Sequence, residues 1–315
     1  MKADWAILDG TEKLSFVLRA LYRDCGFERY RMSKFEEYDL YSRNKEFLVS
    51  ENLITFTDLK GHLKALKPDV TLSIIKNNRD PEAGVRKLCY DEKVYRAKNG
   101  EFREIPQSGV ECFGDVTEES IGEVLTLAAK SLALAGKRYV LSVSDLDILT
   151  GFLGNAASSP EAKDKLTAFI SSRNMSGLKE AALEAGLTEQ EAEKLTALVS
   201  LEGPAEKTLP ALKALAGDNA ALLAGIERLE RIVGAVPEAE RAALELDFSV
   251  TGNTTYYNGV IFKGFVEDVP ERVLSGGQYD GLMKKLGRNS KAVGFAVYLD
   301  TLERIEAPEA EGGAE

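Results

Sequence analysis

The chain changes character near its middle, and this change limits how it can fold. From Ser158 to Glu240 the residues are mostly Ala, Leu, Glu and Lys in helical spacing, with glycines between the helical runs. Strand-like segments lie on both sides of this stretch, at 87–113 and after residue 244. Strands so far apart in sequence can share one core only if the chain returns to the same sheet. The pattern therefore predicts one α+β domain built from both halves of the chain, with an all-helical module inserted between them.

We expect three stretches along the chain. Residues 1–150 and 241–315 form the first and second parts of the core, and residues 151–240 form the helical insertion. Within the core, the spacing of apolar residues predicts amphipathic helices over 11–25 and 117–135. Each of these runs is followed by a glycine, which favours a helix end.

Two glycine-containing segments are typical of turns. Lys98-Asn99-Gly100 separates two strand-like runs and predicts a hairpin. Ser275-Gly276-Gly277 predicts a second turn between later strands. His62 is the one histidine of the chain and follows a glycine in a further predicted turn. A solvated or capping role is favoured there over catalysis.

The composition excludes several classes of protein. The 315 residues include 40 basic and 51 acidic side chains, and the net charge of −11 argues against a protein whose main task is to bind nucleic acid. No apolar run approaches the ~20 residues of a membrane span, and the N-terminus lacks the apolar core of a secretory signal. The three cysteines lie far apart, as in a reducing cytosol, without metal-binding spacing. We therefore expect a cytoplasmic protein with no metal site and no membrane or nucleic-acid partner.

The segment 103–114 has a polar face with a gap in it. If it is a strand, Gln107, Gly109 and Glu111 point to the same side, and the glycine leaves a trough between the two polar side chains. Such a trough suits a small zwitterionic or amide-bearing ligand. The alternative is the solvated outer face of an antiparallel sheet, and this segment alone favours that alternative.

Two later segments repeat the pattern. Tyr257 and Lys263 share a strand face with Gly259, so the tyrosine could offer a ring and a hydroxyl group to a ligand. The alternative is a tyrosine that simply packs on a pleated surface. The glycine cluster before Tyr279 lacks both common phosphate-binding arrangements.

Five segments, in this order, resemble the histidyl-tRNA synthetase family. They resemble even more its non-aminoacylating paralogues, the regulatory subunits of ATP phosphoribosyltransferase. The segments are KPDVT (67–71), VYRAKNGEFREIPQSGVECFGD (94–115), TYYNGVIFKGFV (255–266), SGGQYDGLMKKLG (275–287) and AVGFAVYLD (292–300).

The resemblance implies a histidine-binding site. Gln107 and Glu111 match the positions that hold the amino acid and its imidazole ring. The complete set of matching positions is Asp69, Thr71, Arg96, Gln107, Glu111, Tyr257 and Tyr279. The resemblance also implies a class II synthetase-like antiparallel sheet flanked by helices. Because the sequence ends within about fifteen residues of the last segment, we expect no anticodon-binding domain.

Two arginines of the synthetase pattern are missing. One would lie in the segment that here reads Gly252-Asn253-Thr254-Thr255-Tyr256-Tyr257, and the other falls on Thr301, with Arg304 one helical turn away. Each fixed cation near the reacting phosphate typically contributes ~10²–10³ in rate. Aminoacylation is therefore predicted to be negligible, whereas binding of histidine needs fewer groups.

The resemblance thus implies a non-catalytic regulatory subunit that needs no cofactor. It would pair with a short-form catalytic subunit of ATP phosphoribosyltransferase in a hetero-oligomer and self-associate as a dimer. It would also mediate feedback by L-histidine on the first step of histidine biosynthesis. Two alternatives stay open: a histidyl-tRNA synthetase-like ligase core that activates histidine with ATP, and an interaction protein that has lost its ligand.

Overall fold

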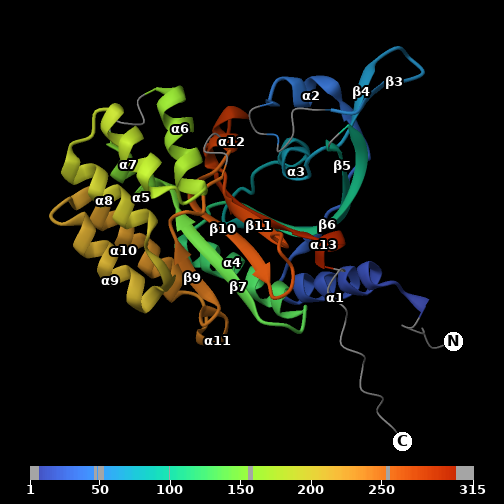
Figure 1. Cartoon of the computed structure of the whole chain (residues 1–315). Helices are drawn as coiled ribbons and strands as arrows, with labels where there is room; N and C mark the ends of the chain where they lie inside the picture. The colour runs from blue at the N-terminus through green and yellow to red at the C-terminus, as the bar shows by residue number, and fades with distance from the viewer. Residues whose placement is uncertain are drawn as a thin grey trace, which may run out of the picture.

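A nine-stranded sheet lies at the centre of the protein (Figure 1). The structure is a computed structural model and describes residues 7–45, 48, 53–98, 100–154, 159–252 and 256–302. Across the sheet the strands follow the order β1 (Glu28–Arg29), β5 (Val85–Lys98), β6 (Glu101–Gly114), β12 (Lys291–Tyr298), β11 (Leu274–Gln278), β10 (Asn258–Val266), β7 (Tyr139–Asp145), β9 (Leu244–Asp247) and β8 (Glu202–Pro204).

The sheet is mostly antiparallel and joins both halves of the chain. Strand β6 of the first half pairs with β12 of the second, and β10 pairs with β7. Only the pairs β1–β5 and β7–β9 are parallel among the described strands. The prediction of one α+β sheet built from both halves is therefore confirmed.

Two amphipathic helices cover one face of this sheet. Helices α1 (Gly10–Asp24) and α4 (Glu118–Ala133) form where the apolar spacing predicts them. A capping box between Asp9 and Glu12 satisfies backbone groups at the start of α1. The even-numbered residues of β6, such as Val110 and Cys112, pack against these helices.

A second core lies over the opposite face. It contains the short helices α2 (Tyr38–Ser42), α3 (Thr71–Asn77) and α12 (Asp280–Lys285). Beside them is a three-stranded sheet of β2 (Phe35–Glu37), β4 (Leu63–Leu66) and β3 (Thr55–Thr57). His62 lies in the β3–β4 turn with an exposed ring, as expected.

A cluster of helices lies beside the sheet, on the left in Figure 1. It consists of α6 (Pro160–Ser171), α7 (Met175–Glu184), α8 (Glu189–Val199), α9 (Ala205–Ala216) and α10 (Ala220–Gly234). The flanking helices are α5 (Leu146–Leu153) and α11 (Glu238–Arg241). The prediction that the insertion is all-helical is wrong at one place. The three-residue strand β8 lies between α8 and α9 and pairs with β9, so the sheet extends into this region through a contact with a distant strand that local spacing does not reveal. No helix of the described residues is long and apolar enough to cross a membrane.

Two ion pairs join the helical cluster to the sheet. Arg228 of α10 contacts Asp145 at 3.0 Å, and it also donates a hydrogen bond of 2.6 Å to Gln278. Arg173 contacts Asp247 at 2.8 Å. The hairpin predicted at residues 98–100 is present, since Lys98 pairs with Glu101; Asn99 lies outside the described residues.

The turn predicted at Ser275-Gly276-Gly277 is wrong, because these residues form part of β11 between β10 and β12. A Cβ atom on Gly276 would lie 2.4 Å from the carbonyl oxygen of Gly294 and 2.6 Å from the ring of Phe262. The glycine is therefore required by close packing within the sheet. A pair of glycines predicts a turn from local sequence, but here it marks a strand without side-chain bulk.

Candidate functional site

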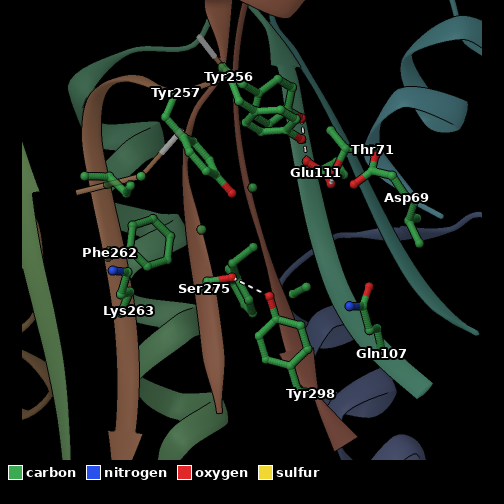
Figure 2. Close-up of a pocket in the computed structure, with 18 of the residues that line it drawn as sticks. Asp69, Thr71, Gln107, Glu111, Tyr256, Tyr257, Phe262, Lys263, Ser275 and Tyr298 are labelled. Carbon is green, nitrogen blue, oxygen red and sulfur yellow. Dashed lines mark hydrogen bonds between the residues drawn. The ribbon is translucent and has the colours of Figure 1, made fainter. Parts of the chain in front are cut away.

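A cavity of about 280 Å³ lies on the face of the sheet opposite α4 (Figure 2). The register of the paired strands determines which residues form the floor of the cavity. One row across four strands contains Glu111, Gly294, Gly277 and Ile261, and the next contains Gly109, Ala296, Ser275 and Lys263. The middle of each row is glycine, alanine or serine, so the sheet leaves open space there. Glu111 and Ile261 end the first row, and Lys263 ends the second row opposite Gly109.

Three glycines of the floor each lie under a side chain of the site. A Cβ atom on Gly294 would lie 2.0 Å from a carboxyl oxygen of Glu111. On Gly109 it would lie 2.5 Å from the hydroxyl oxygen of Tyr90, and on Gly277 it would lie 2.9 Å from the ring of Tyr257. The absence of side chains at these positions therefore gives the cavity its shape.

Glu111 is the central polar group of the cavity, and its side chain is bonded at both oxygens. It is 2 % exposed. Thr71 donates a hydrogen bond of 2.5 Å to one carboxyl oxygen, and the hydroxyl group of Tyr279 donates to the other. Burial raises the pKa of Glu111 to about 8, against the lowering effect of these two hydrogen bonds. The group therefore holds a proton at neutral pH.

Asp69 adds a second carboxyl group to the same end of the cavity. It lies just before α3 and accepts a hydrogen bond of 2.9 Å from the backbone of Leu72. Burial raises the pKa of Asp69, and the nearby positive charge of Arg96 opposes this effect. Arg96 itself donates from Nε to the carbonyl oxygen of Pro68 at 3.0 Å. These contacts hold Asp69 and Arg96 in the cavity wall.

Tyrosine rings form one wall of the cavity. The ring of Tyr256 lies 4.5 Å from that of Tyr257 and 5.9 Å from that of Tyr279, measured between centroids. Burial raises the pKa of Tyr257 and of Tyr279, so both hydroxyl groups remain protonated. They can both donate and accept hydrogen bonds at neutral pH.

Gln107 lies on the opposite wall with a free amide group. Its side chain is 3 % exposed and forms no hydrogen bond with any other described residue. It shares a face of β6 with Glu111, as the alternation predicted, and Figure 2 shows it pointing toward the cavity. Because this amide group borders the cavity and has no hydrogen-bond partner among the described residues, it is available to a ligand.

The end of the cavity away from Glu111 carries different chemistry. Ser275 and Tyr298 form a hydrogen bond of 2.7 Å, and the guanidinium group of Arg272 lies 5.9 Å from the ring centre of Tyr298. Lys263 lines the same end. Burial, together with the charge of Arg272, lowers the pKa of Lys263.

The structure brings every predicted site residue to the lining of this one cavity: Asp69, Thr71, Arg96, Gln107, Glu111, Tyr257 and Tyr279. Gly252 also lines it, whereas residues 253–255 and Arg304 lie outside the described part of the chain. Thr301 lies in α13 (Leu299–Leu302) and does not line the cavity.

The sequence did not identify the far end as part of the site. Alternation placed Lys263 on the face of Tyr257, but gave it no role. Ser275 and Tyr298 lie in segments of the resemblance but had no predicted role, because only the pairing of β11 with β12 brings them together at the cavity. Arg272, just before β11, carried no sequence signal. Within the described part of the chain, no group of three or more His, Cys, Asp or Glu side chains could hold a metal ion.

The site can therefore bind a small ligand that carries both polar and ionic groups. Two carboxyl groups and Arg96 lie at one end, Lys263 and Arg272 lie at the other, and tyrosine and glutamine side chains lie between them. The volume falls just below the ~300–1,000 Å³ range of typical small-molecule pockets, which suits a ligand of amino-acid size.

Comparison with known proteins identifies related chains. The sequence model of the histidyl-tRNA synthetase family matches residues 9–302. A protein of Caldanaerobacter subterraneus named ATP phosphoribosyltransferase regulatory subunit is 30 % identical over 296 residues, which cover 91 % of this chain and 75 % of the relative.

Solved structures share the fold. One is described as an ATP phosphoribosyltransferase regulatory subunit/histidyl-tRNA synthetase from Bacillus halodurans, with a TM-score of 0.81 and 23 % identity over 97 % of this chain and 83 % of that one. Another is a chain of the ATP phosphoribosyl transferase (HisG:HisZ) complex from Thermotoga maritima. Its TM-score is 0.69, with 17 % identity over 92 % of this chain and 97 % of that one.

Proposed function

The chain belongs to the histidyl-tRNA synthetase family, and we propose that within it the chain is a regulatory subunit of ATP phosphoribosyltransferase that binds L-histidine. The names of its relatives support the first part of this proposal, since proteins about 30 % identical over most of the chain are regulatory subunits. The partner is then the short-form catalytic subunit, which joins ATP to phosphoribosyl pyrophosphate.

The observation that carries histidine binding is the buried carboxyl group of Glu111. An imidazole ring has one nitrogen that donates and one that accepts a hydrogen bond, or two that donate when it is protonated. Glu111 can donate to a neutral ring when the carboxyl group holds the proton, and it can accept from the ring when the ring holds the proton. The tyrosine wall supplies an apolar surface for the ring.

The remaining groups suit the rest of an amino acid. Asp69 lies at the same end of the cavity as Glu111 and can accept hydrogen bonds from an ammonium group. The amide of Gln107 has no partner among the described residues and can bond to either polar group of the ligand. A cavity of about 280 Å³ holds an amino acid more readily than an amino acid together with ATP.

The same cavity argues for binding without chemistry. Adenylate formation needs fixed cations aimed at the reacting phosphate. The matching position of one such cation is Thr301, which lies outside the cavity lining.

Feedback by histidine then takes the form of a coupling free energy between two sites. If histidine binds more tightly to an inactive state of the complex, substrates of the catalytic subunit must weaken histidine binding by the same factor. Assembly of the complex and dimerisation of this chain are parts of the proposal.

The test is reconstitution with the catalytic subunit. We expect the two proteins to co-purify, activity to increase when this chain is added, and L-histidine to inhibit the complex. Glu111→Ala should assemble and support activity but lose the response to histidine. ATP–pyrophosphate exchange that depends on histidine would instead establish the ligase alternative. A folded chain that shows no binding at millimolar L-histidine would support an interaction protein without a ligand.

A further inference from the structure

Two cations line the end of the cavity away from Glu111, and neither has an acidic partner. Lys263 and Arg272 form no ion pair with any other residue in the described ranges. Asp247 is the one carboxylate whose charge acts on Lys263, and Arg173 already holds it at 2.8 Å. This end of the cavity therefore carries positive charge without an acidic ion-pair partner among the described residues, on half-buried Lys263 and on exposed Arg272.

The two cations also act on each other. The charge of Arg272 adds to burial in lowering the pKa of Lys263. A half-buried ammonium group beside a like charge is unfavourable unless an anion lies close to both. The position is thus suited to an anionic group of a ligand.

Strand register connects these cations to Glu111. Lys263 lies in the same row as Ser275, Ala296 and Gly109, which spans three strand spacings, or about 14 Å between the outer Cα atoms. Glu111 is two residues further along β6. The small residues between them leave the floor clear, and Figure 2 shows Lys263 and Glu111 on opposite sides of the cavity. One small ligand can therefore reach both.

We propose that Lys263, with Arg272 beside it, binds the α-carboxylate of the amino acid whose imidazole ring contacts Glu111. This inference rests on the proposed binding of histidine. Arg96 is the competing cation of the cavity, but its Nε is bonded to Pro68 and its charge is opposed by Asp69. Lys263 has no such opposing contact.

The test compares two ligands that differ only at the carboxylate. Calorimetry on the full chain would measure binding of L-histidine and of L-histidinol, in which an alcohol replaces the carboxylate. Lys263→Met should weaken the binding of L-histidine by roughly 10- to 100-fold, as expected for loss of a charged hydrogen bond. It should leave L-histidinol within about twofold, and Lys263→Arg should retain most of the L-histidine affinity. Lys291→Met, at the exposed start of β12, is the matched control and should change neither.

Other binding results would contradict a carboxylate-binding role for Lys263. If Lys263→Met weakens both ligands equally, or neither, the carboxylate does not bind there and the inference is wrong, while histidine binding stands. If the unmodified chain binds no L-histidine, both the inference and the proposed function fail. Arg272→Met should show the same selectivity with a smaller loss, which keeps the test decisive should Lys263→Met fold poorly.

Discussion

The carboxyl group of Glu111 rests on the backbone of Gly294: a Cβ atom on that glycine would lie 2.0 Å from Oε2 of Glu111. It would also lie 2.5 Å from the carbonyl oxygen of Val110, which is backbone and cannot turn away. The site is thus formed as much by absent side chains on β12 as by present ones on β6.

Gly294→Ala should therefore displace Glu111 and abolish histidine binding. Forcing one extra methyl group into such a contact typically destabilises a protein by ~1–3 kcal/mol, which urea unfolding would measure. Gly234→Ala is the control, because Gly234 lies in a helix and a Cβ atom there would meet open space. It should leave binding unchanged and stabilise the chain by less than about 1 kcal/mol, because Gly234 is the last residue of the helix. Normal binding by Gly294→Ala would contradict this account of the cavity floor.

Glu111 should make the protein less stable as pH rises. Its pKa is about 8 in the folded chain against an ordinary 4.5, so between these values unfolding releases a proton and the free energy of unfolding falls with pH. Glu111→Gln removes this contribution. Unfolding measured from pH 5 to pH 9 should show a shallower decline in that variant.

Part of the decline should persist, because burial also raises the pKa of Asp145, to about 6, and that of Asp69. Glu104→Gln is the matched control, since contact with Lys93 lowers the pKa of Glu104. Its contribution therefore changes only at lower pH. Equal slopes for Glu111→Gln and the unmodified chain would show that Glu111 is not protonated when buried.

Histidine affinity should fall above about pH 8. We expect the bound pair of Glu111 and imidazole ring to share one proton, which Glu111 already holds below that pH. Above that pH, binding in this form takes up a proton. The affinity should then decrease about tenfold per pH unit. Calorimetry in buffers of different ionisation enthalpy would measure the number of protons taken up when histidine binds. Glu111→Gln should lack this uptake, which separates it from titration of the ligand or of Lys263.

Arg228→Met should loosen the contact between α10 and the sheet. It leaves Asp145, which is 1 % exposed, without its cation. Loss of one partner of a buried ion pair typically costs about 3–5 kcal/mol, and adding Asp145→Asn should recover part of it. Lys213→Met breaks the exposed pair with Glu230 and should cost less than about 1 kcal/mol. A similar loss of stability for both variants in chemical denaturation would refute the buried role of Arg228.

Local patterns predicted local structure well. Helix spacing located α1 and α4, and strand alternation placed Gln107 and Glu111 on one face. These features depend on neighbours within a few residues. The seven candidate residues came from a resemblance, and the structure gathers them around one cavity.

Other features depend on contacts between distant strands. The glycines of β11 predicted a turn because the sequence does not reveal that β12 and β10 pack on both sides of them. Lys263 and Tyr298 gained a place in the site only through strand register. The contact of Arg228 with Asp145 spans 83 positions, and no local signal points to it.

The pairing of β6 with β12 also determines when the cavity can form during synthesis of the chain. Tyr279 and Glu111 are 168 positions apart, yet they form one hydrogen bond of the cavity. The ribosome must therefore synthesise nearly the whole chain, including the last strands, before the ligand-binding cavity can form. Contacts between such distant segments form slowly, because a long loop must close first. Until β12 is synthesised, β6 is an unpaired edge strand of the sheet. Chaperones or other chains can bind to such an edge.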